Sequence, residues 1–181
     1  MLYSHSLREM NRGEGLLNLR FNDYLLENVY LRTTEAQRAE IMALWQQEGA
    51  VPDPAERARR SHEVVFMVRN AAGELAGLCT VGLTRVPDGR VFYAYRMFLR
   101  PQDRMPYLMW AVIDGTRDFL RDFTHPDTPT AGLYLITENP KLMRPGMTRS
   151  FQRHGYAYRG KTVHGLDLWV AEFAGKAIKS A

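Results

Sequence analysis

The part of the chain best suited to binding an anion is residues 96–120, RMFLRPQDRMPYLMWAVIDGTRDFL. An apolar strand stops at a proline, a short polar turn follows, and an amphipathic helix then begins. The first N–H groups of a helix have no acceptor inside the helix, and its aligned peptide dipoles favour negative charge there. A pyrophosphate can therefore sit at this helix N-terminus, and Arg104 in the turn can clamp a phosphate through its planar guanidinium.

Side chains that can bind ligands or transfer protons lie on two predicted strands and just beyond them. Tyr93 and Tyr95 share one face of the predicted strand 91–99, and Arg96 faces the other way, because successive strand residues alternate. An arginine among apolar neighbours is costly to bury unless it is paired, so Arg96 either forms a structural ion pair or contacts a ligand. Glu138, at the end of a later strand, is either a general base or an exposed loop carboxylate.

Other chemistry-bearing residues have simpler explanations. His154, just before Gly155, can take part in proton transfer or can stabilise a helix C-terminus as a cation. Cys79 is the single cysteine, and its apolar surroundings LAGLCTVGL predict a buried core residue. The sequence contains no HExxH, GxSxG or P-loop signature, and it predicts no metal site.

Length and composition predict one soluble domain. The chain has 181 residues, of which 45% are hydrophobic, enough for one sizeable core. It contains no run of eighteen apolar residues, and its first residues lack the apolar core of a signal peptide, so we expect a cytoplasmic protein. We expect residues 1–27 to be an extension of unassigned structure, residues 28–173 to be one domain, and residues 174–181 to be a loose tail.

The basic residues are mostly arginine. The formal net charge is +4, and 20 of the 24 basic residues are arginines. Arginine binds phosphate in a two-pronged way, so this bias is compatible with a nucleic-acid or nucleotide partner. GC-rich coding produces the same bias, and the arginines are spread along the chain. Both explanations stay open at this point.

The predicted elements alternate between strands and helices. A short strand at residues 29–32 precedes a helix that Thr33 or Thr34 caps. Three strands follow, HEVVFMVRN, LAGLCTVGLTRV and VFYAYRMFLRP, joined by the glycine-containing turns AAGE and PDGR. We expect these three strands to form an antiparallel meander.

The second half of the chain continues the alternation. The helix after the meander has an apolar stripe that we expect to pack on the sheet. A buried strand at residues 133–137 and a short helix ending at Gly155 come next. A final hairpin shows alternation at Leu166, Leu168 and Val170.

This order resembles that of the GCN5-related N-acetyltransferases (GNAT), from about Val29 to Phe173. YLRTTEAQRAEIMALW is similar to the family's opening strand and helix, and FLRPQDRMPYLM is similar to its cofactor loop. ENP and FQRHGYAYRG resemble its penultimate strand and following helix, with the Gly-aromatic pair at Gly155 and Tyr156. The resemblance implies an α+β fold (α/β three-layer), with a mixed, mostly antiparallel central sheet of six to seven strands flanked by helices. It also implies that the sheet is splayed between strands 4 and 5.

The resemblance implies acetyl-CoA, or another acyl-CoA, as cofactor. In the family its pyrophosphate lies at the helix N-terminus, and its pantetheine arm lies in the gap between the fourth and fifth strands. Those strands are Val91–Leu99 and Leu133–Thr137 here. The cofactor-binding residues so implied are Phe98, Leu99, Arg104, Met105, Tyr107, Leu108, Asn139 and Phe151. The catalytic candidates near the same cleft are Glu138, Tyr95, Arg96 and His154.

The chain departs from the family pattern in its loop and in its acid and base. The family has glycines after the arginine, whereas Met105, Pro106 and Tyr107 follow Arg104. Proline also lacks an N–H donor, although it suits the first turn of a helix. The usual carboxylate of the fourth strand is absent, and the usual tyrosine four residues before the Gly-aromatic pair is Phe151.

Two functions follow as hypotheses. The first is an acyl-CoA-dependent N-acyltransferase in which an amine attacks the thioester directly; positioning and backbone donors can supply much of the acceleration. Its acceptor is a small-molecule or macromolecular amine, and DNA is included because bacteriophage DNA-modifying acyltransferases are related to the family. The second is an inactive GNAT-like binding module for protein or nucleic acid. Residues 1–27 can also serve as a dimerisation arm, which makes a homodimer a third expectation.

Overall fold

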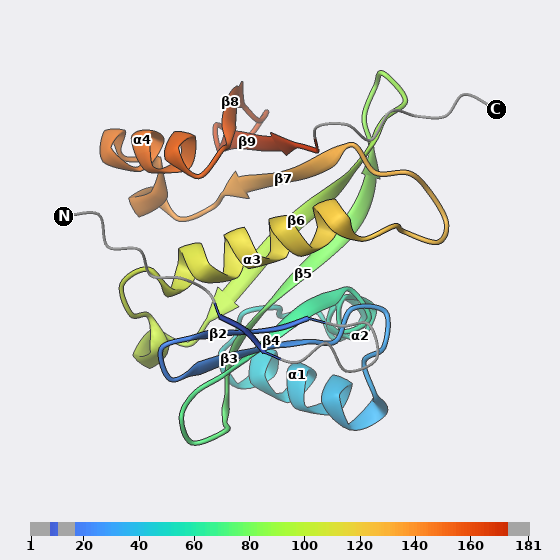
Figure 1. Cartoon of the computed structure of the whole chain (residues 1–181), viewed down its shortest axis with the longest axis vertical. Coiled ribbons are helices and arrows are strands. Elements are labelled where there is room, and N and C mark those ends of the chain that lie inside the picture. Colours follow the sequence, from blue (N-terminus) through green and yellow to red (C-terminus); the bar gives the residue numbers. More distant parts are fainter. Residues whose placement is uncertain (1–7, 11–16, 174–181) are drawn as a thin grey trace. The chain divides into compact units, whose positions relative to one another are not determined.

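The computed structural model describes residues 8–10 and 17–173 of the chain. Nine strands form one sheet in the order β1-β2-β3-β4-β5-β6-β7-β9-β8 (Figure 1). The strands are β1 (Arg8–Met10), β2 (Asn18–Phe21), β3 (Tyr24–Asn28), β4 (Val64–Arg69), β5 (Leu75–Arg85), β6 (Val91–Leu99), β7 (Gly132–Thr137), β8 (Ala157–Lys161) and β9 (Asp167–Glu172). The α-helices are α1 (Glu35–Gln47), α2 (Pro54–Arg60), α3 (Leu108–Asp122) and α4 (Pro145–Arg153), and the short 3-10 helices are η1 (Pro101–Asp103) and η2 (Pro140–Met143).

Two compact units share these elements and are described separately. Unit 1 comprises the described residues up to Val81 together with Met97–Phe119, and unit 2 comprises Gly82–Arg96 together with the described residues from Leu120 onward. The elements β5, β6 and α3 contribute residues to both. None of the described helices is long and apolar enough to span a membrane.

Unit 1 has three layers. Met67 of β4 and Leu78 of β5 belong to one buried cluster with Trp45 of α1. Phe66 of β4 meets Phe119 of α3 edge to face, with ring centroids 6.1 Å apart. Because successive strand residues point to opposite faces, Phe66 and Met67 place these two helices on opposite sides of the strands. The predicted three-layer arrangement is confirmed here.

The helix α1 begins as the sequence predicts. Thr34 is its N-cap: the hydroxyl accepts the Gln37 amide, and the Gln37 side chain accepts the Thr34 amide. This reciprocal pair satisfies two amide donors that a helix N-terminus otherwise leaves without partners. The predicted apolar face is also confirmed, because Ile41, Leu44 and Trp45 are buried.

The strand predicted at residues 29–32 is wrong, because the chain turns there. β3 ends at Asn28, whose side-chain oxygen accepts the Tyr30 amide at 3.1 Å. Leu31 then takes a positive φ of 59°, which no strand residue adopts. The asparagine thus offers the backbone a local hydrogen bond that competes with a sheet ladder.

The N-terminal part of the chain adds strands to the sheet. β1, β2 and β3 pair antiparallel in turn, and β3 pairs antiparallel with β4. The prediction of six to seven strands is therefore too low, and the sheet has nine. Asn22 and Asp23 form the turn between β2 and β3, and Asn22 has a φ of 51°, a conformation that asparagine tolerates better than most residues.

Gly77 allows β5 and the end of β6 to approach closely. A Cβ atom at this position would lie 2.4 Å from the carbonyl oxygen of Phe98 and 2.9 Å from the Cα of Leu99. Only glycine fits such an approach without moving one strand. Gly77 thus positions the last residues of β6, directly before the loop that carries Arg104.

Unit 2 contains the one parallel pair in the described sheet. β6 pairs parallel with β7, from Phe92–Gly132 to Tyr95–Leu135, and β9 pairs antiparallel with β7 and with β8. The β6–β7 ladder stops at Tyr95 and Leu135, although β6 continues to Leu99 and β7 continues to Thr137. The predicted splay between the family's fourth and fifth strands corresponds to this early end of the ladder.

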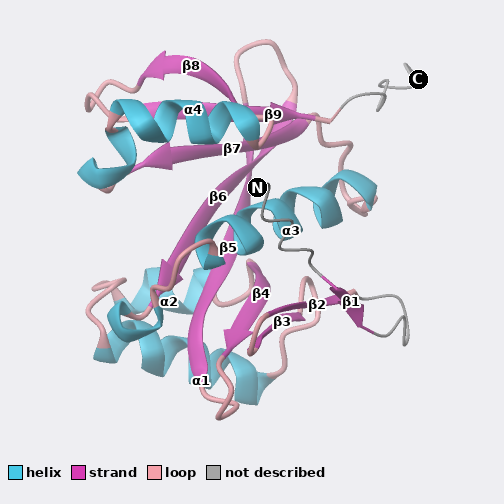
Figure 2. Cartoon of the chain, turned by 60° about the vertical axis from the view of Figure 1, so that its left-hand side comes forward, coloured by secondary structure: helices cyan, strands magenta, loops and turns pink. Residues whose placement is uncertain are grey.

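The helix α4 covers one face of β9 (Figure 2). Phe151 of α4 stacks on Trp169 of β9, with ring centroids 4.7 Å apart and an interplanar angle of 18°. Gly155 has a φ of 81° just after the helix, as the sequence predicts for a C-terminal cap. The predicted alternation at Leu168 and Val170 is present, but these residues are half-buried on the face away from α4, because Trp169 occupies the covered face.

Candidate functional site

The candidate anion-binding loop lies in unit 1, between the end of β6 and α3. Several of its amides already donate to backbone carbonyls. The Asp103 amide donates to the Arg100 carbonyl at 3.0 Å, and the Met105 amide donates to the Asp103 carbonyl at 2.9 Å. The Arg104 amide donates to the Pro101 carbonyl and the Leu108 amide donates to the Met105 carbonyl, each through a long hydrogen bond of 3.4 Å. These four amides already have acceptors, because η1 folds the loop on itself, so the loop offers an anion fewer donors than the sequence suggests.

An open donor remains at the first turn of α3. The first i to i−4 bond of the helix runs from the Ala111 amide to the Tyr107 carbonyl at 2.9 Å. Met109 precedes that bond, and its amide has no backbone acceptor within residues 17–173. First-turn amides have no partner inside a helix. Among the donors predicted at this helix N-terminus, the Met109 amide is thus still open to an anion, whereas the Leu108 amide is already bonded.

Tyr107 takes a backbone conformation that favours glycine. Its φ is 67°, and 59% of its surface is exposed. The family resemblance predicted glycines among the residues that follow Arg104, and Tyr107 is one of those residues. The loop therefore keeps a left-handed backbone at this point although a tyrosine occupies it, at a cost of about 1 kcal/mol or more.

Replacing Tyr107 with glycine should stabilise the protein. Tyr107→Gly removes the left-handed strain, and we expect the free energy of unfolding to rise by about 1 kcal/mol. Tyr107→Ala removes the ring but keeps a Cβ, so it should give no such gain. Urea denaturation of both variants measures the difference. Equal stability of the two variants would show that the backbone strain is not what the substitution relieves.

A buried carboxylate fixes the start of the loop. Asp103 is 6% exposed; it accepts the Nε–H of Arg100 at 2.7 Å and the hydroxyl of Tyr24 at 3.1 Å. Arg100 also reaches Glu74 at 3.2 Å. Burial and the hydrogen bond to Asp103 raise the pKa of Tyr24 above its ordinary value. The Asp103 carboxylate likewise raises the pKa of Arg100, because it favours the charged guanidinium. Neither Tyr24 nor Asp103 stands out in the sequence, because they are far apart in the chain.

Arg104 is exposed and is held beside the end of β6. Its Nε donates to the Leu99 carbonyl at 3.0 Å, and this is its only side-chain bond within the described residues. The terminal N–H groups of the guanidinium are thus available to a ligand. Phe98 packs partly buried against the core and Leu99 is buried. The structure therefore gathers the predicted loop residues at one place in unit 1: Phe98, Leu99, Arg104, Met105, Tyr107 and Leu108.

Tyr95 and Arg96 stand where the β6–β7 ladder ends, in unit 2. Tyr95 is buried, and Arg96 is exposed. Arg96 has no ion pair with any residue of the described part of the chain. Because its side chain is exposed, Arg96 needs no partner to offset the cost of burial. A structural ion pair is thus not its role, and contact with a ligand stays a prediction.

The residues after β7 are exposed. Glu138 and Asn139 follow the strand directly, and Glu138 has no ion pair within the described ranges. Asn139 is the N-cap of η2, where its side-chain oxygen accepts the Lys141 amide at 3.0 Å. Asn139 thus has a structural role in the start of η2, and its predicted contact with a cofactor stays a prediction.

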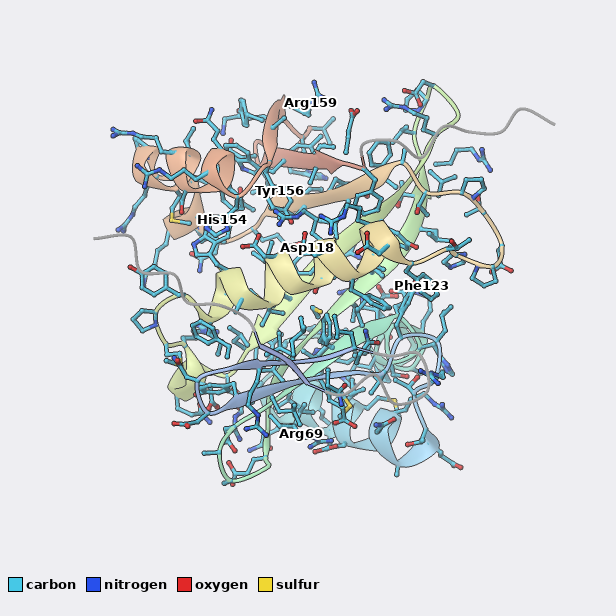
Figure 3. All side chains as sticks on the ribbon, in the orientation of Figure 1. Arg69, Asp118, Phe123, His154, Tyr156 and Arg159 are labelled. Carbon is cyan, nitrogen blue, oxygen red and sulfur yellow. The ribbon has the colours of Figure 1, made fainter. Side chains whose placement is uncertain are left out.

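Phe151 and His154 lie at the C-terminal half of α4. Phe151 is fully buried against Trp169, and Tyr156 meets the Phe151 ring edge to face at 6.1 Å. His154 caps the helix, with its amide 3.1 Å from the Ser150 and Phe151 carbonyls, and Tyr156 leads into β8 (Figure 3). The cap position agrees with the structural explanation of His154, because a cation there favours the helix C-terminus.

A groove of about 640 Å³ lies on the other face of β7 and β9. The charged residues that line the groove neutralise one another. The Glu172 carboxylate forms ion pairs with Arg159 at 3.1 Å and with Arg90 at 3.5 Å. Arg90 also pairs with Asp88 at 2.8 Å. Leu168 is among its apolar lining residues. The sequence does not predict this groove, because the alternation in β9 does not show which face α4 covers.

Comparisons by sequence give no match, either with protein-family models or with curated proteins. Solved structures do match. A GNAT superfamily phosphinothricin acetyltransferase from Sinorhizobium meliloti, in complex with AcCoA, has a TM-score of 0.63 at 13% identity, over 88% of this chain and 94% of that chain. The ribosomal-protein-S5-alanine acetyltransferase from Vibrio fischeri has a TM-score of 0.60 at 11% identity, over 89% of this chain and 99% of that chain. This chain has the GNAT fold.

A third GNAT-fold match is Arabidopsis thaliana NAA60 in complex with acetyl-CoA, with a TM-score of 0.53 at 11% identity, over 84% of this chain and 99% of that chain. The GNAT fold confirms the predicted fold class, a mixed sheet flanked by helices. At these identities the likeness concerns the fold alone. Residue roles are therefore argued from the geometry of this chain.

Proposed function

We propose that the chain is an acyl-CoA-dependent N-acyltransferase, which uses acetyl-CoA or another acyl-CoA and an amine acceptor. The observation that carries this proposal is the loop before α3, where Arg104 is anchored to the end of β6 and Tyr107 keeps a left-handed backbone. Two of the proteins that share the fold are in complex with AcCoA or acetyl-CoA. We assign the acyltransferase domain to residues 28–173.

The residues present fit a diphosphate group. The guanidinium of Arg104 offers terminal N–H donors, and the amide of Met109 offers a first-turn donor of α3. Met105 and Tyr107 would line the loop around them, beside Phe98. The side chains of Leu99 and Leu108 are buried, so these two predicted residues would offer the cofactor only their backbone. When bound, the cofactor supplies a thioester whose acyl carbon is open to attack by an amine.

The catalytic candidates from the family resemblance stay proposals, and each is described by its own surroundings. Glu138 is an exposed carboxylate at the end of β7 and would take the proton of the attacking amine. Arg96 is exposed at the end of the β6–β7 ladder and would contact the acceptor or the cofactor. Tyr95 and His154 stay candidates for proton transfer, and Asn139 and Phe151 stay candidates for cofactor contact.

Calorimetric titration with acetyl-CoA tests the proposal. We expect saturable binding, and we expect Arg104→Ala to weaken it by about 10- to 100-fold, since a hydrogen bond to a charged group contributes about 1.5–3 kcal/mol. Arg59→Ala is the matched control, because Arg59 is an exposed arginine of α2. A wild-type chain that does not bind acetyl-CoA would contradict the proposal, and so would an Arg104→Ala variant that binds as tightly as the wild type.

The second candidate is a GNAT-like binding module without chemistry. The closure of the loop favours it, because the Asp103 and Met105 amides are already bonded and Pro106 has none. An assay of thioester cleavage with a panel of amines separates the candidates: a transferase consumes acetyl-CoA only when an acceptor is present. A nucleic-acid acceptor stays a prediction for this site, and a homodimer formed through residues 1–27 stays a separate prediction.

A further inference from the structure

We infer that the exposed surface of η2 and α4 binds the phosphate backbone of nucleic acid. This inference does not rest on acyl transfer. Its starting point is the distribution of charge in residues 139–166, a segment of 28 residues that contains no aspartate or glutamate. Six lysines and arginines lie in the segment, whereas the chain as a whole has 24 basic and 20 acidic residues.

Four of these cations have no partner in the described part of the chain. They are exposed and lie on η2 or α4, or just between them: Lys141, Arg144, Arg149 and Arg153. Residues 17–173 provide neither an ion pair nor a side-chain hydrogen bond for any of the four. The two remaining cations of the segment are different, because Arg159 pairs with Glu172 and Lys161 pairs with Asp167.

Arginines elsewhere in the chain are mostly compensated by nearby carboxylates. Arg69 lies 2.8 Å from Glu27 and 2.9 Å from Glu40, and the α2 arginines Arg59 and Arg60 both pair with Glu56. The large groove on β7 and β9 is likewise neutral, so it offers no net attraction to an anion. Other arginines of the described residues also have no carboxylate partner, but they lie on different elements: Arg38, Arg57, Arg85, Arg96 and Arg104. Only η2 and α4 bring four such cations together in one short stretch of the described chain.

The fold of α4 directs these cations outward. Phe151 is fully buried under the helix, against Trp169. Arg149 and Arg153 are two residues to either side of Phe151, so at 100° per residue both lie on the opposite side of the helix. They are one turn apart, about 6 Å along the axis. Arg144 is the N-cap residue of α4 and is also exposed, but it is seven residues before Phe151 and so is not in line with the other two. The result is a patch of exposed cations, with Arg149 and Arg153 side by side on the solvent face of α4.

Nucleic acid is the polyanion that such a patch fits best. Each DNA strand has one phosphate per about 3.4 Å of helix axis, so the roughly 6 Å between Arg149 and Arg153 matches about two phosphate spacings of one strand. Guanidinium groups bind phosphate oxygens through two parallel N–H bonds, which favours arginine at such contacts. No acidic side chain lies in the segment to oppose that field.

Salt-dependent binding to a labelled 20-base-pair duplex tests the inference. With four phosphate contacts, the slope of log affinity against log salt should be about −3.6, so affinity falls about 150-fold between 50 and 200 mM salt. The double variant R149Q/R153Q should have a slope of about −1.8 and lose only about 12-fold over the same range. Fluorescence anisotropy at three salt concentrations gives both slopes.

The matched control is R59Q/R121Q, which removes the same formal charge from exposed, ion-paired arginines. It should keep the wild-type slope. The inference is overturned if R149Q/R153Q also keeps that slope, or if the control loses as much as the test variant. It is also overturned if polyglutamate displaces the duplex at equal charge concentration, because the surface then fits an acidic polypeptide. Acetyl-CoA binding is a separate readout, so failure here leaves the transferase proposal untouched.

Discussion

Replacing Asp103 with alanine should lower the free energy of unfolding by about 3 kcal/mol, because it removes one partner of a mostly buried ion pair. The side chain of Asp103 is 7% exposed and that of Arg100 is 16% exposed. The substitution leaves the Arg100 guanidinium with Glu74, which is 61% exposed, and it leaves the Tyr24 hydroxyl without its carboxylate acceptor. The pKa of Tyr24 should move back toward its ordinary value, since the carboxylate no longer opposes the phenolate.

Two control variants distinguish the ion pair from its neighbours. Tyr24→Phe removes a single hydrogen bond and should cost about 1 kcal/mol. Glu74→Ala removes an exposed carboxylate and should change stability little, because exposed ion pairs contribute little. Chemical denaturation gives all three values. An Asp103→Ala variant as stable as Glu74→Ala would show that the pair does not hold the loop.

Asp103 also links stability to the proposed cofactor site. The residue directly precedes Arg104, and the pair with Arg100 closes η1 at the base of the loop. Tyr24 lies 79 residues away in the sequence, on the strand β3. If the loop binds a diphosphate, Asp103→Ala should weaken acetyl-CoA binding although Asp103 itself offers the cofactor no donor. Asp103 therefore acts as a positioning residue.

The features that the sequence predicts well are those set by near neighbours in the chain. Thr34 and Gln37 are three residues apart and cap α1 together. Gly73 and Gly89, in the turns AAGE and PDGR, have the positive φ values that those turns require, 78° and 86°. Such signals do not depend on the rest of the fold, so they can be interpreted without knowledge of what packs against them.

The features that the sequence did not predict depend on distant residues. The alternation in β9 shows two faces, but only the stacking of Phe151 on Trp169 decides which one is buried. The end of β3 at Asn28 depends on one side-chain hydrogen bond that competes with continued pairing. The bond between Tyr24 and Asp103 joins residues that no local pattern connects. For the same reason, the exposure of Arg96 depends on what covers its face of β6, which the sequence of β6 alone does not reveal.

Replacing Phe151 with alanine should be the most destabilising of the substitutions considered, at about 3–5 kcal/mol. Phe151 is completely buried, and it contacts Trp169 face to face and Tyr156 edge to face. The variant leaves a cavity the size of an aromatic ring under α4 and removes both aromatic contacts. Gln152→Ala, at an exposed neighbouring position, should change stability by no more than about 0.5 kcal/mol.

Phe151→Leu decides whether this residue also contacts the cofactor, as the family resemblance predicts. Leucine keeps an apolar side chain of reduced size, so the protein should stay folded while the ring contacts are lost. If Phe151 serves only the packing of α4 on β9, the leucine variant should bind acetyl-CoA as the wild type does and should lose only unfolding free energy. A weaker affinity for acetyl-CoA in a fully folded Phe151→Leu variant would instead place the ring of Phe151 at the cofactor. The pair of measurements thus separates a core residue from a binding residue at the position where the family has its tyrosine.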